Sequence, residues 1–230
     1  MDTNRRSGIV TGTLFLAATA AGCLSLLARP ILDAPDYLTK ISSNEPKVIA
    51  AAFLVFIMGW AGAGIGISMY PVLRKYNVGL ALGGAGFRII EGVFDGIGAV
   101  LILMLATLSR EFLKAGPAAL GQFQYLGALL SEARSWVSDV AALPAWCIGA
   151  LLYYSLFYRA RLVPRWLSVW GLIGITLTLA ASILVLFRLI APMSTVQLLM
   201  NLPIAPQEMV LAIWLIVKGF NPSAKTSLPV

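Results

Sequence analysis

Three ionisable residues inside one long apolar run have the spacing that most clearly points to chemistry. Arg88, Glu91 and Asp95 stand at offsets of three and four, so in a helix they share one face. A charge at membrane depth costs on the order of 2.5–3.5 kcal/mol on insertion scales. These side chains must therefore face the protein interior or water, and they predict a polar site inside an apolar bundle.

A fourth ionisable residue, Glu208, is expected at the same depth. Counting at about 1.5 Å per residue places Glu91 roughly 16 Å, Arg88 roughly 12 Å and Glu208 about 15 Å from one face of the membrane. Pro203 and Pro206 come just before Glu208, so the helix there should break or begin late. Exposed backbone at that depth is tolerated only where it is buried or lines a cavity. The pattern predicts a polar chamber near the bilayer midplane, between the third and sixth membrane helices.

The predicted chamber sets several carboxyl groups against one cation. Its expected members are Arg88, Glu91, Asp95, Gln207 and Glu208. In one interpretation Arg88 forms a buried ion pair with Glu91 or Glu208 that only fixes which helices pack together. In the other, the surplus leaves at least one carboxyl protonated at neutral pH, able to donate a hydrogen bond or a proton to a substrate. The residues alone leave both interpretations open.

The second interpretation gives roles to particular side chains. The candidate catalytic acids are Glu91, Glu208 and Asp95, and the candidate ligand-binding residues are Arg88, Gln207, Tyr153 and Trp60. Tyr153 is expected on the fourth helix, where it could reach the chamber, with aromatic packing as the alternative. Trp60 stands deeper in its run than the tryptophans of an interfacial belt, which suggests a place lining an interior space.

The composition excludes most other kinds of site. Of the 230 residues, 59% are hydrophobic and 12% charged, whereas soluble domains have about 45–50% and about 25%, so the chain is not a soluble globule. The absence of histidine excludes Ser-His-Asp and Cys-His nucleophiles, histidine-bound metals and histidine-ligated haem. Cys23 and Cys147 stand far apart in apolar runs. We therefore expect no disulfide, no metal site and no cofactor, and both thiols as small buried hydrophobes.

Six apolar runs are long enough to cross a membrane, which takes about 20 residues. They cover residues 8–27, 48–70, 80–108, 139–157, 167–190 and 203–220. The expected fold is all-α, a polytopic membrane bundle of six transmembrane helices in a single domain over residues 1–230. Residues 122–134 have apolar positions at spacings of three and four. They predict an amphipathic interfacial helix, lying along the membrane surface before the fourth span.

Small residues predict which helices meet most closely. Gly62 and Gly66 in the second run, and Gly92 and Gly96 in the third, are four residues apart. This spacing lets membrane helices approach at short distance. We expect the second and third helices to form the tight centre of the bundle.

The basic residues orient the bundle. An even number of crossings puts both termini on one face, whose nine basic residues oppose a single acid, Asp2. The nine are Arg5, Arg6, Arg74, Lys75, Arg159, Arg161, Arg165, Lys218 and Lys225. The other face has seven basic but also six acidic residues, so the positive-inside rule places both termini in the cytoplasm. The same rule accounts for the net charge of +7 without a nucleic-acid partner.

Four segments carry a resemblance to a known family. They are PILDAPDYL from Pro30, GFRIIEG from Gly86, PRWLSVWGLIG from Pro164 and PQEMVLAIWLIVKGF from Pro206. Together they resemble the bacterial integral membrane family catalogued as domain of unknown function 4386, over nearly the whole chain. The resemblance implies a membrane protein of six or seven helices in the bacterial inner membrane, and it supplies no activity or substrate. Arg88, Glu91 and Glu208 lie within these segments, whereas Asp95 lies just outside.

Three functions remain as hypotheses. The first is that the chamber binds, or chemically processes, a small amphiphilic or lipid-like molecule, with one carboxyl as proton donor. The second is a non-catalytic accessory or scaffold subunit, whose partner would be another membrane protein or a second copy of the chain. The third is a proton-coupled transporter, which the absence of similarity between the two halves disfavours. Membrane lipid is a partner in each case.

The expected orientation can be tested by cysteine accessibility in intact cells. Single cysteines placed at Asn44 and at Gly116 should react with a membrane-impermeant reagent from outside. Cysteines at Asn77 and at Ala160 should stay protected until the cells are opened. Labelling at Asn77 from outside would overturn the orientation.

Overall fold

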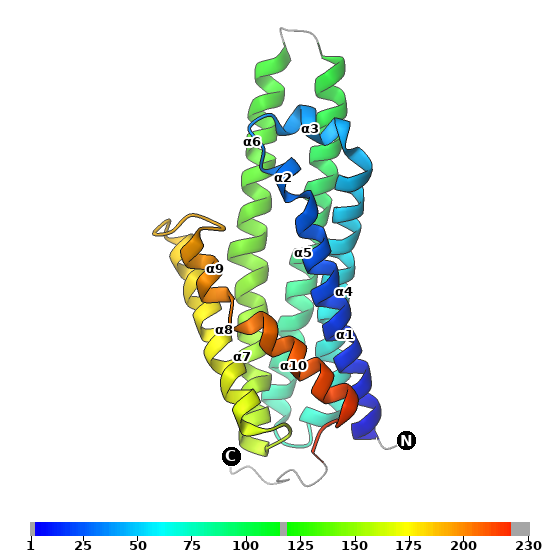
Figure 1. The fold of residues 1–230 in the computed structure, drawn as a ribbon, viewed down its shortest axis with the longest axis vertical. Coiled ribbons are helices and arrows are strands. Elements are labelled where there is room, and N and C mark those ends of the chain that lie inside the picture. Colours follow the sequence, from blue (N-terminus) through cyan, green and yellow to red (C-terminus); the bar gives the residue numbers. More distant parts are fainter. Residues whose placement is uncertain (1–2, 116–118, 222–230) are drawn as a thin grey trace.

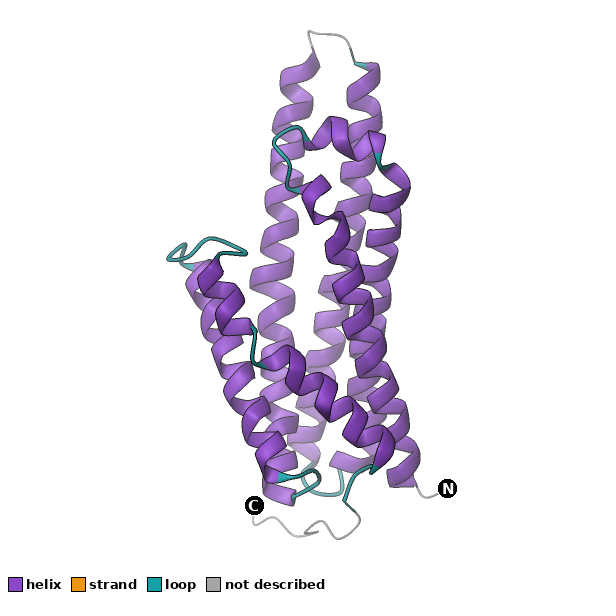
Figure 2. Cartoon of the chain, in the orientation of Figure 1, coloured by secondary structure: helices purple, strands orange, loops and turns teal. Residues whose placement is uncertain are grey.

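The computed structural model describes residues 3–115 and 119–221 as a bundle of helices, and these residues contain no strand (Figure 1, Figure 2). The first half contains α1 (Thr3–Ser25), η1 (Leu26–Ala28), α2 (Arg29–Leu32), α3 (Tyr37–Ser43), α4 (Glu45–Leu73) and α5 (Val78–Lys114). The second half contains α6 (Leu120–Trp136), η3 (Val137–Ala142), α7 (Leu143–Ala160), α8 (Arg165–Leu186), α9 (Thr195–Asn201) and α10 (Ile204–Val217).

Six helical stretches are long and apolar enough to cross a membrane. They are Asn4–Leu32, Glu45–Leu73, Val78–Lys114, Leu120–Ala160, Arg165–Leu186 and Thr195–Val217. The prediction of an all-α bundle with six membrane helices is therefore confirmed. The first and last described residues lie at the same end of the bundle (Figure 1), as an even number of crossings requires.

Local chemistry sets the helix ends. The Asn77 side chain caps α5 by accepting a hydrogen bond from the Leu80 backbone N–H at 2.8 Å, which satisfies one of the free donors of the first turn. Helix α7 ends where Arg161 adopts a left-handed conformation with φ of 55°, a common way to stop a helix. The break predicted at Pro203 is found, because α9 ends at Asn201 and α10 begins at Ile204. Helix α10 then crosses the bundle obliquely between α8 and α1 (Figure 1).

The separate interfacial helix predicted for residues 122–134 is not found. These residues belong to α6, which continues through the wide π-type turn η3 into α7, so that 41 residues form one helical stretch. Helix α6 packs alongside the end of α5 rather than standing apart from it (Figure 1). The 37 residues of α5 span about 55 Å, whereas the hydrocarbon core is about 30 Å thick. These two helices therefore extend beyond the apolar layer; Gly116 lies outside the described residues.

Glycines bring α4 and α5 into backbone contact. A Cβ atom built on Gly59 would lie 3.0 Å from the Gly92 carbonyl oxygen, and one on Gly92 would lie 2.6 Å from the Gly59 carbonyl oxygen. A Cβ on Gly66 would lie 3.0 Å from the Ala85 Cα. No larger side chain fits at these positions without moving a helix. The expected close packing of the second and third membrane helices is thus present.

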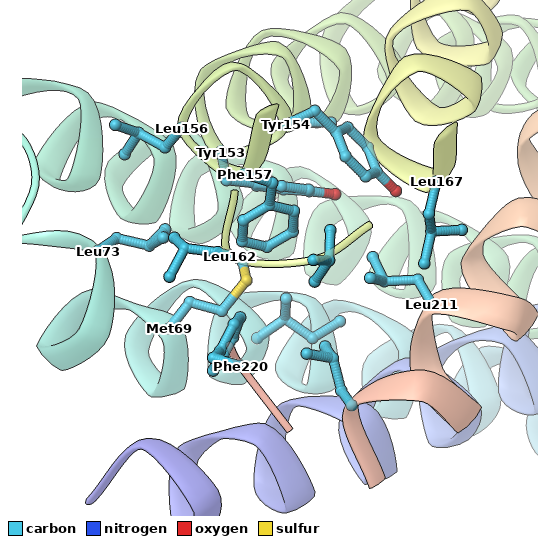
Figure 3. Close-up of a cluster of buried hydrophobic side chains, with 14 of the residues drawn as sticks. Met69, Leu73, Tyr153, Tyr154, Leu156, Phe157, Leu162, Leu167, Leu211 and Phe220 are labelled. Atoms are coloured by element: carbon cyan, nitrogen blue, oxygen red, sulfur yellow. The ribbon is translucent and has the colours of Figure 1, made fainter. Parts of the chain in front are cut away.

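An aromatic and aliphatic cluster fills the half of the bundle near the termini (Figure 3). The rings of Tyr153, Tyr154 and Phe157 on α7 pack against one another, with Tyr153 and Tyr154 centroids 4.6 Å apart. Phe220, after α10, packs on Phe157 at 5.8 Å between centroids. Met69 of α4 belongs to the same cluster. The cluster therefore joins α4, α7 and the C-terminal end of α10.

The glycine contact predicts the effect of one added methyl group. Gly92→Ala should lower the free energy of unfolding in detergent by about 1–3 kcal/mol, because the methyl overlaps the Gly59 carbonyl. Gly86→Ala on the same helix is the matched control, since nothing lies within 4 Å of its Cβ position. Its stability should stay the same or rise by up to about 1 kcal/mol from helix propensity. Equal stability of the two variants would contradict the contact.

Candidate functional site

A buried ion pair lies at the contact of α4 and α5. The Arg88 side chain is only 3% exposed, and its Nη1 lies 2.8 Å from Glu91 Oε2, one turn along α5. Its Nε donates a hydrogen bond to the Gly62 carbonyl oxygen of α4 at 3.2 Å. A Cβ on Gly62 would lie 3.1 Å from Arg88 Nη2. The missing side chain at Gly62 therefore gives the guanidinium access to the α4 backbone.

Two further carboxyl groups face the same region. Asp95 follows Glu91 on the same face of α5; it is 8% exposed, and its buried Oδ2 has no hydrogen-bond partner among the described residues. Glu208 projects from α10, where the Trp146 indole lies close enough to interact with its carboxyl group. The Arg88 guanidinium lies within electrostatic reach of both acids as well as of Glu91. Three carboxyl groups thus share one buried cation.

These four side chains line a pocket with a volume of about 470 Å³. Its walls come from α1, η1, α2, α4, α5, α6, η3, α7 and α10, and they are mostly apolar. Representative lining residues are Ala18, Met58, Phe94, Ile102, Leu143 and Trp146. Cys23 also lines the pocket and is exposed, whereas Cys147 is buried. The expectation that both thiols are buried is therefore wrong for Cys23.

Three predicted site residues do not line the pocket. Gln207 is fully buried; it accepts a hydrogen bond from the Tyr154 hydroxyl at 2.6 Å and donates one to the Leu167 carbonyl oxygen at 3.1 Å. Its amide therefore joins α10 to α7 and α8. Tyr153 packs in the aromatic cluster and does not line the pocket, but it lies within electrostatic reach of Arg88 and Glu208. Trp60 is 64% exposed on the outside of α4, where it stacks on Phe56.

The far end of the pocket has a charged group that the sequence did not reveal. Arg29 and Arg134 both line the pocket there. Asp33 accepts from Arg29 at 2.7 Å and from Arg134 at 2.5 Å. The Arg29–Asp33 pair has the local i,i+4 spacing, whereas Asp33 and Arg134 are 101 residues apart, so local spacing could not indicate that contact. The pocket therefore runs from an acid-rich inner end to an arginine-bearing outer end.

The acids do not form a recognisable metal centre. Among the described residues, no group of three or more acidic or cysteine side chains is close enough together to hold a metal ion. What the arrangement offers is hydrogen bonding and proton transfer by carboxyl groups in a largely apolar enclosure.

Comparison with known proteins gives one match. A family described as a domain of unknown function (DUF4386) matches residues 10–219. No curated protein and no solved structure matches the chain.

The ion pair predicts an unequal pattern of double-mutant coupling. Arg88→Leu should lower the free energy of unfolding in detergent by about 3–5 kcal/mol, because it leaves buried carboxylates without their cation. Adding Glu91→Gln should recover part of the loss, since a neutral amide needs no counter-charge, with a coupling of about 0.5–3 kcal/mol. Glu208→Gln should couple less, because it makes no direct ion pair with Arg88.

An exposed ion pair is the control for this cycle. Lys114→Leu removes the partner of Glu111, a pair whose side chains are 70% and 53% exposed, and should cost no more than about 1 kcal/mol. A neutral effect of Arg88→Leu would mean that Arg88 contacts water or a bound anion instead.

Proposed function

The chain belongs to the family described as a domain of unknown function (DUF4386), and we propose that this membrane protein binds a small amphiphilic or lipid-like molecule. The observation that carries the proposal is the pocket into which Arg88, Glu91, Asp95 and Glu208 converge. Its volume of about 470 Å³ falls within the range of ligand pockets, about 300–1,000 Å³. A mostly apolar wall with a few polar groups is also typical of such sites.

The charges of the inner end indicate which polar group the molecule carries there. Glu91 is held by Arg88, whereas Asp95 and Glu208 make no direct ion pair among the described residues. An anionic group would meet surplus carboxyls at a depth where water screens little. A neutral hydrogen-bonding group or an amine would instead complement them. The apolar part of the molecule would then lie along the wall formed by α1, α5 and η3.

The same carboxyls give the pocket a chemical capacity. A carboxyl group that is not committed to an ion pair can donate a proton to a bound substrate, and exclusion of water strengthens this effect. Asp95 and Glu208 are the residues for that role, because Arg88 already engages Glu91. Arg88 then acts as a positioning residue that keeps Glu91 in place.

A purely structural role for the buried charges would explain fewer features of the site than ligand binding does. The Arg88–Glu91 pair alone would suit a device for choosing helix partners. Such a device needs no adjoining cavity and no unpartnered buried carboxyl oxygen, both of which adjoin this pair. We therefore favour ligand binding over scaffolding.

Native mass spectrometry of protein purified in mild detergent tests the proposal. The wild-type chain should carry a discrete co-purifying molecule or take one up from added lipid extract. Gly98→Leu should reduce occupancy at least about tenfold, because Gly98 lines the pocket and the nearest atom to its Cβ position is 4.0 Å away, so the new side chain fills the cavity. Glu208→Gln should weaken binding without filling space.

A substitution on the same helix but outside the pocket serves as control. Gly86→Leu adds the same atoms at a position with nothing within 4 Å, and should keep wild-type occupancy. A molecule that stays bound equally in Gly98→Leu would lie elsewhere, and a wild-type chain that binds nothing would contradict the proposal.

A further inference from the structure

A second pocket lies at the end of the bundle that carries the termini. It has a volume of about 370 Å³ and lies between the α7–α8 connection and the C-terminal end of α10. Three cationic residues line it: Arg161 and Arg165 from the connection, and Lys218 after α10. Trp214 of α10 lines it as well. The pocket is separate from the one proposed to bind an amphiphile and shares no lining residue with it.

Among the described residues, no acidic group compensates the charge of this second pocket. None of its lining residues is acidic, and none of the three cations forms an ion pair with another described residue. The Arg165 Cζ lies over the Tyr158 ring, 5.3 Å from its centroid. Arg5 adds a further cation beside the pocket, since its Nη1 donates to the Leu215 carbonyl oxygen at 3.3 Å and lies beside Gly219.

The backbone of this pocket is fixed by hydrogen bonds. The Asn221 N–H donates to the Leu162 carbonyl oxygen at 2.8 Å, and Asn221 Nδ2 donates to the Arg161 carbonyl oxygen at 3.2 Å. Leu162 N–H donates to the Phe157 carbonyl oxygen at 3.1 Å. The α7–α8 connection is thereby joined to the segment after α10. A site whose walls are held in this way loses little entropy when a ligand binds.

We propose that this pocket binds a phosphate group, carried by an anionic lipid headgroup or by a free phosphate ion. Guanidinium and ammonium groups are the usual phosphate ligands, with charge-assisted hydrogen bonds. The pocket lies where α7 ends, α8 begins and α10 ends, and the ends of membrane-spanning helices are where lipid headgroups are expected. Basic pockets between the ends of membrane helices are typical headgroup sites.

The test compares phosphatidylglycerol with phosphatidylcholine, added to the full-length protein in detergent. Binding is followed by native mass spectrometry and by the rise in thermal midpoint. The wild-type chain should bind phosphatidylglycerol more tightly. Arg161→Gln with Lys218→Gln should weaken that preference by about tenfold to thirtyfold, from two lost charges. Arg74→Gln with Lys75→Gln removes two charges at the same end of the bundle, outside the pocket, and should keep the preference.

Two further experiments determine which molecule carries the phosphate group and whether the lost charge causes the loss of binding. Inorganic phosphate at millimolar concentration should compete with the lipid if the site takes free phosphate, and should leave lipid binding unchanged if the site takes a headgroup. The charge-conserving pair Arg161→Lys with Lys218→Arg should retain binding. The proposal would be overturned if the charge-conserving pair lost as much phosphatidylglycerol binding as the Gln pair. It would also be overturned if the Arg161/Lys218 and the Arg74/Lys75 Gln variants bound this lipid with equal affinity.

Discussion

The burial of one guanidinium group within an apolar bundle constrains the rest of this structure. The Arg88 side chain is only 3% exposed on α5, and two of its hydrogen-bond partners come from the protein. Glu91 supplies one partner on the same helix, and the Gly62 carbonyl supplies another from α4. That second bond requires the backbones of α4 and α5 to approach closely. The contact between Gly59 and Gly92, which have no side chains to separate the helices, allows this approach. The close packing of α4 and α5 and the hydrogen bonding of the buried Arg88 guanidinium therefore depend on each other.

The same constraint accounts for the position of the pocket. Surplus carboxyl groups around Arg88 cannot be covered by apolar side chains without losing their solvation, so Asp95 and Glu208 adjoin a cavity instead. Helix α10 is short and oblique because the break at Pro203 starts it late. Its first turns therefore bring Glu208 toward α5 rather than continuing the line of α9. The break before α10 therefore places Glu208 beside the other carboxyl groups.

Local spacing predicted much of this arrangement. Offsets of three and four settle that Arg88, Glu91 and Asp95 share a face, whatever the tertiary structure. The direction of an isolated side chain around its helix is different, because it depends on neighbours that local spacing does not identify. Trp60 follows Gly59 directly, so it points about 100° away from the face that packs on α5, where its ring is exposed and stacks on Phe56.

Gln207 and residues 122–134 also differ from their expected placement. Gln207 lies about 100° around α10 from Glu208, and its amide bonds Tyr154 and Leu167 instead of lining the pocket. The amphipathic pattern of residues 122–134 specifies a helix but not its direction relative to the membrane. No glycine or proline stands between Arg134 and Leu143, and this was the available signal that the helix continues.

The wide turn at η3 sets the angular phase between the two ends of the pocket. Arg134 and Trp146 are 12 residues apart, which in a regular α-helix would separate their directions by about 120°. A π-type turn absorbs about one extra residue, which reduces the difference to about 20° at about 100° per residue. Both side chains consequently line one cavity. If the turn became regular α-helix without losing a residue, the arginine end would rotate out of phase with the acid end, whereas deleting one residue of the turn along with that change would keep the two ends in phase.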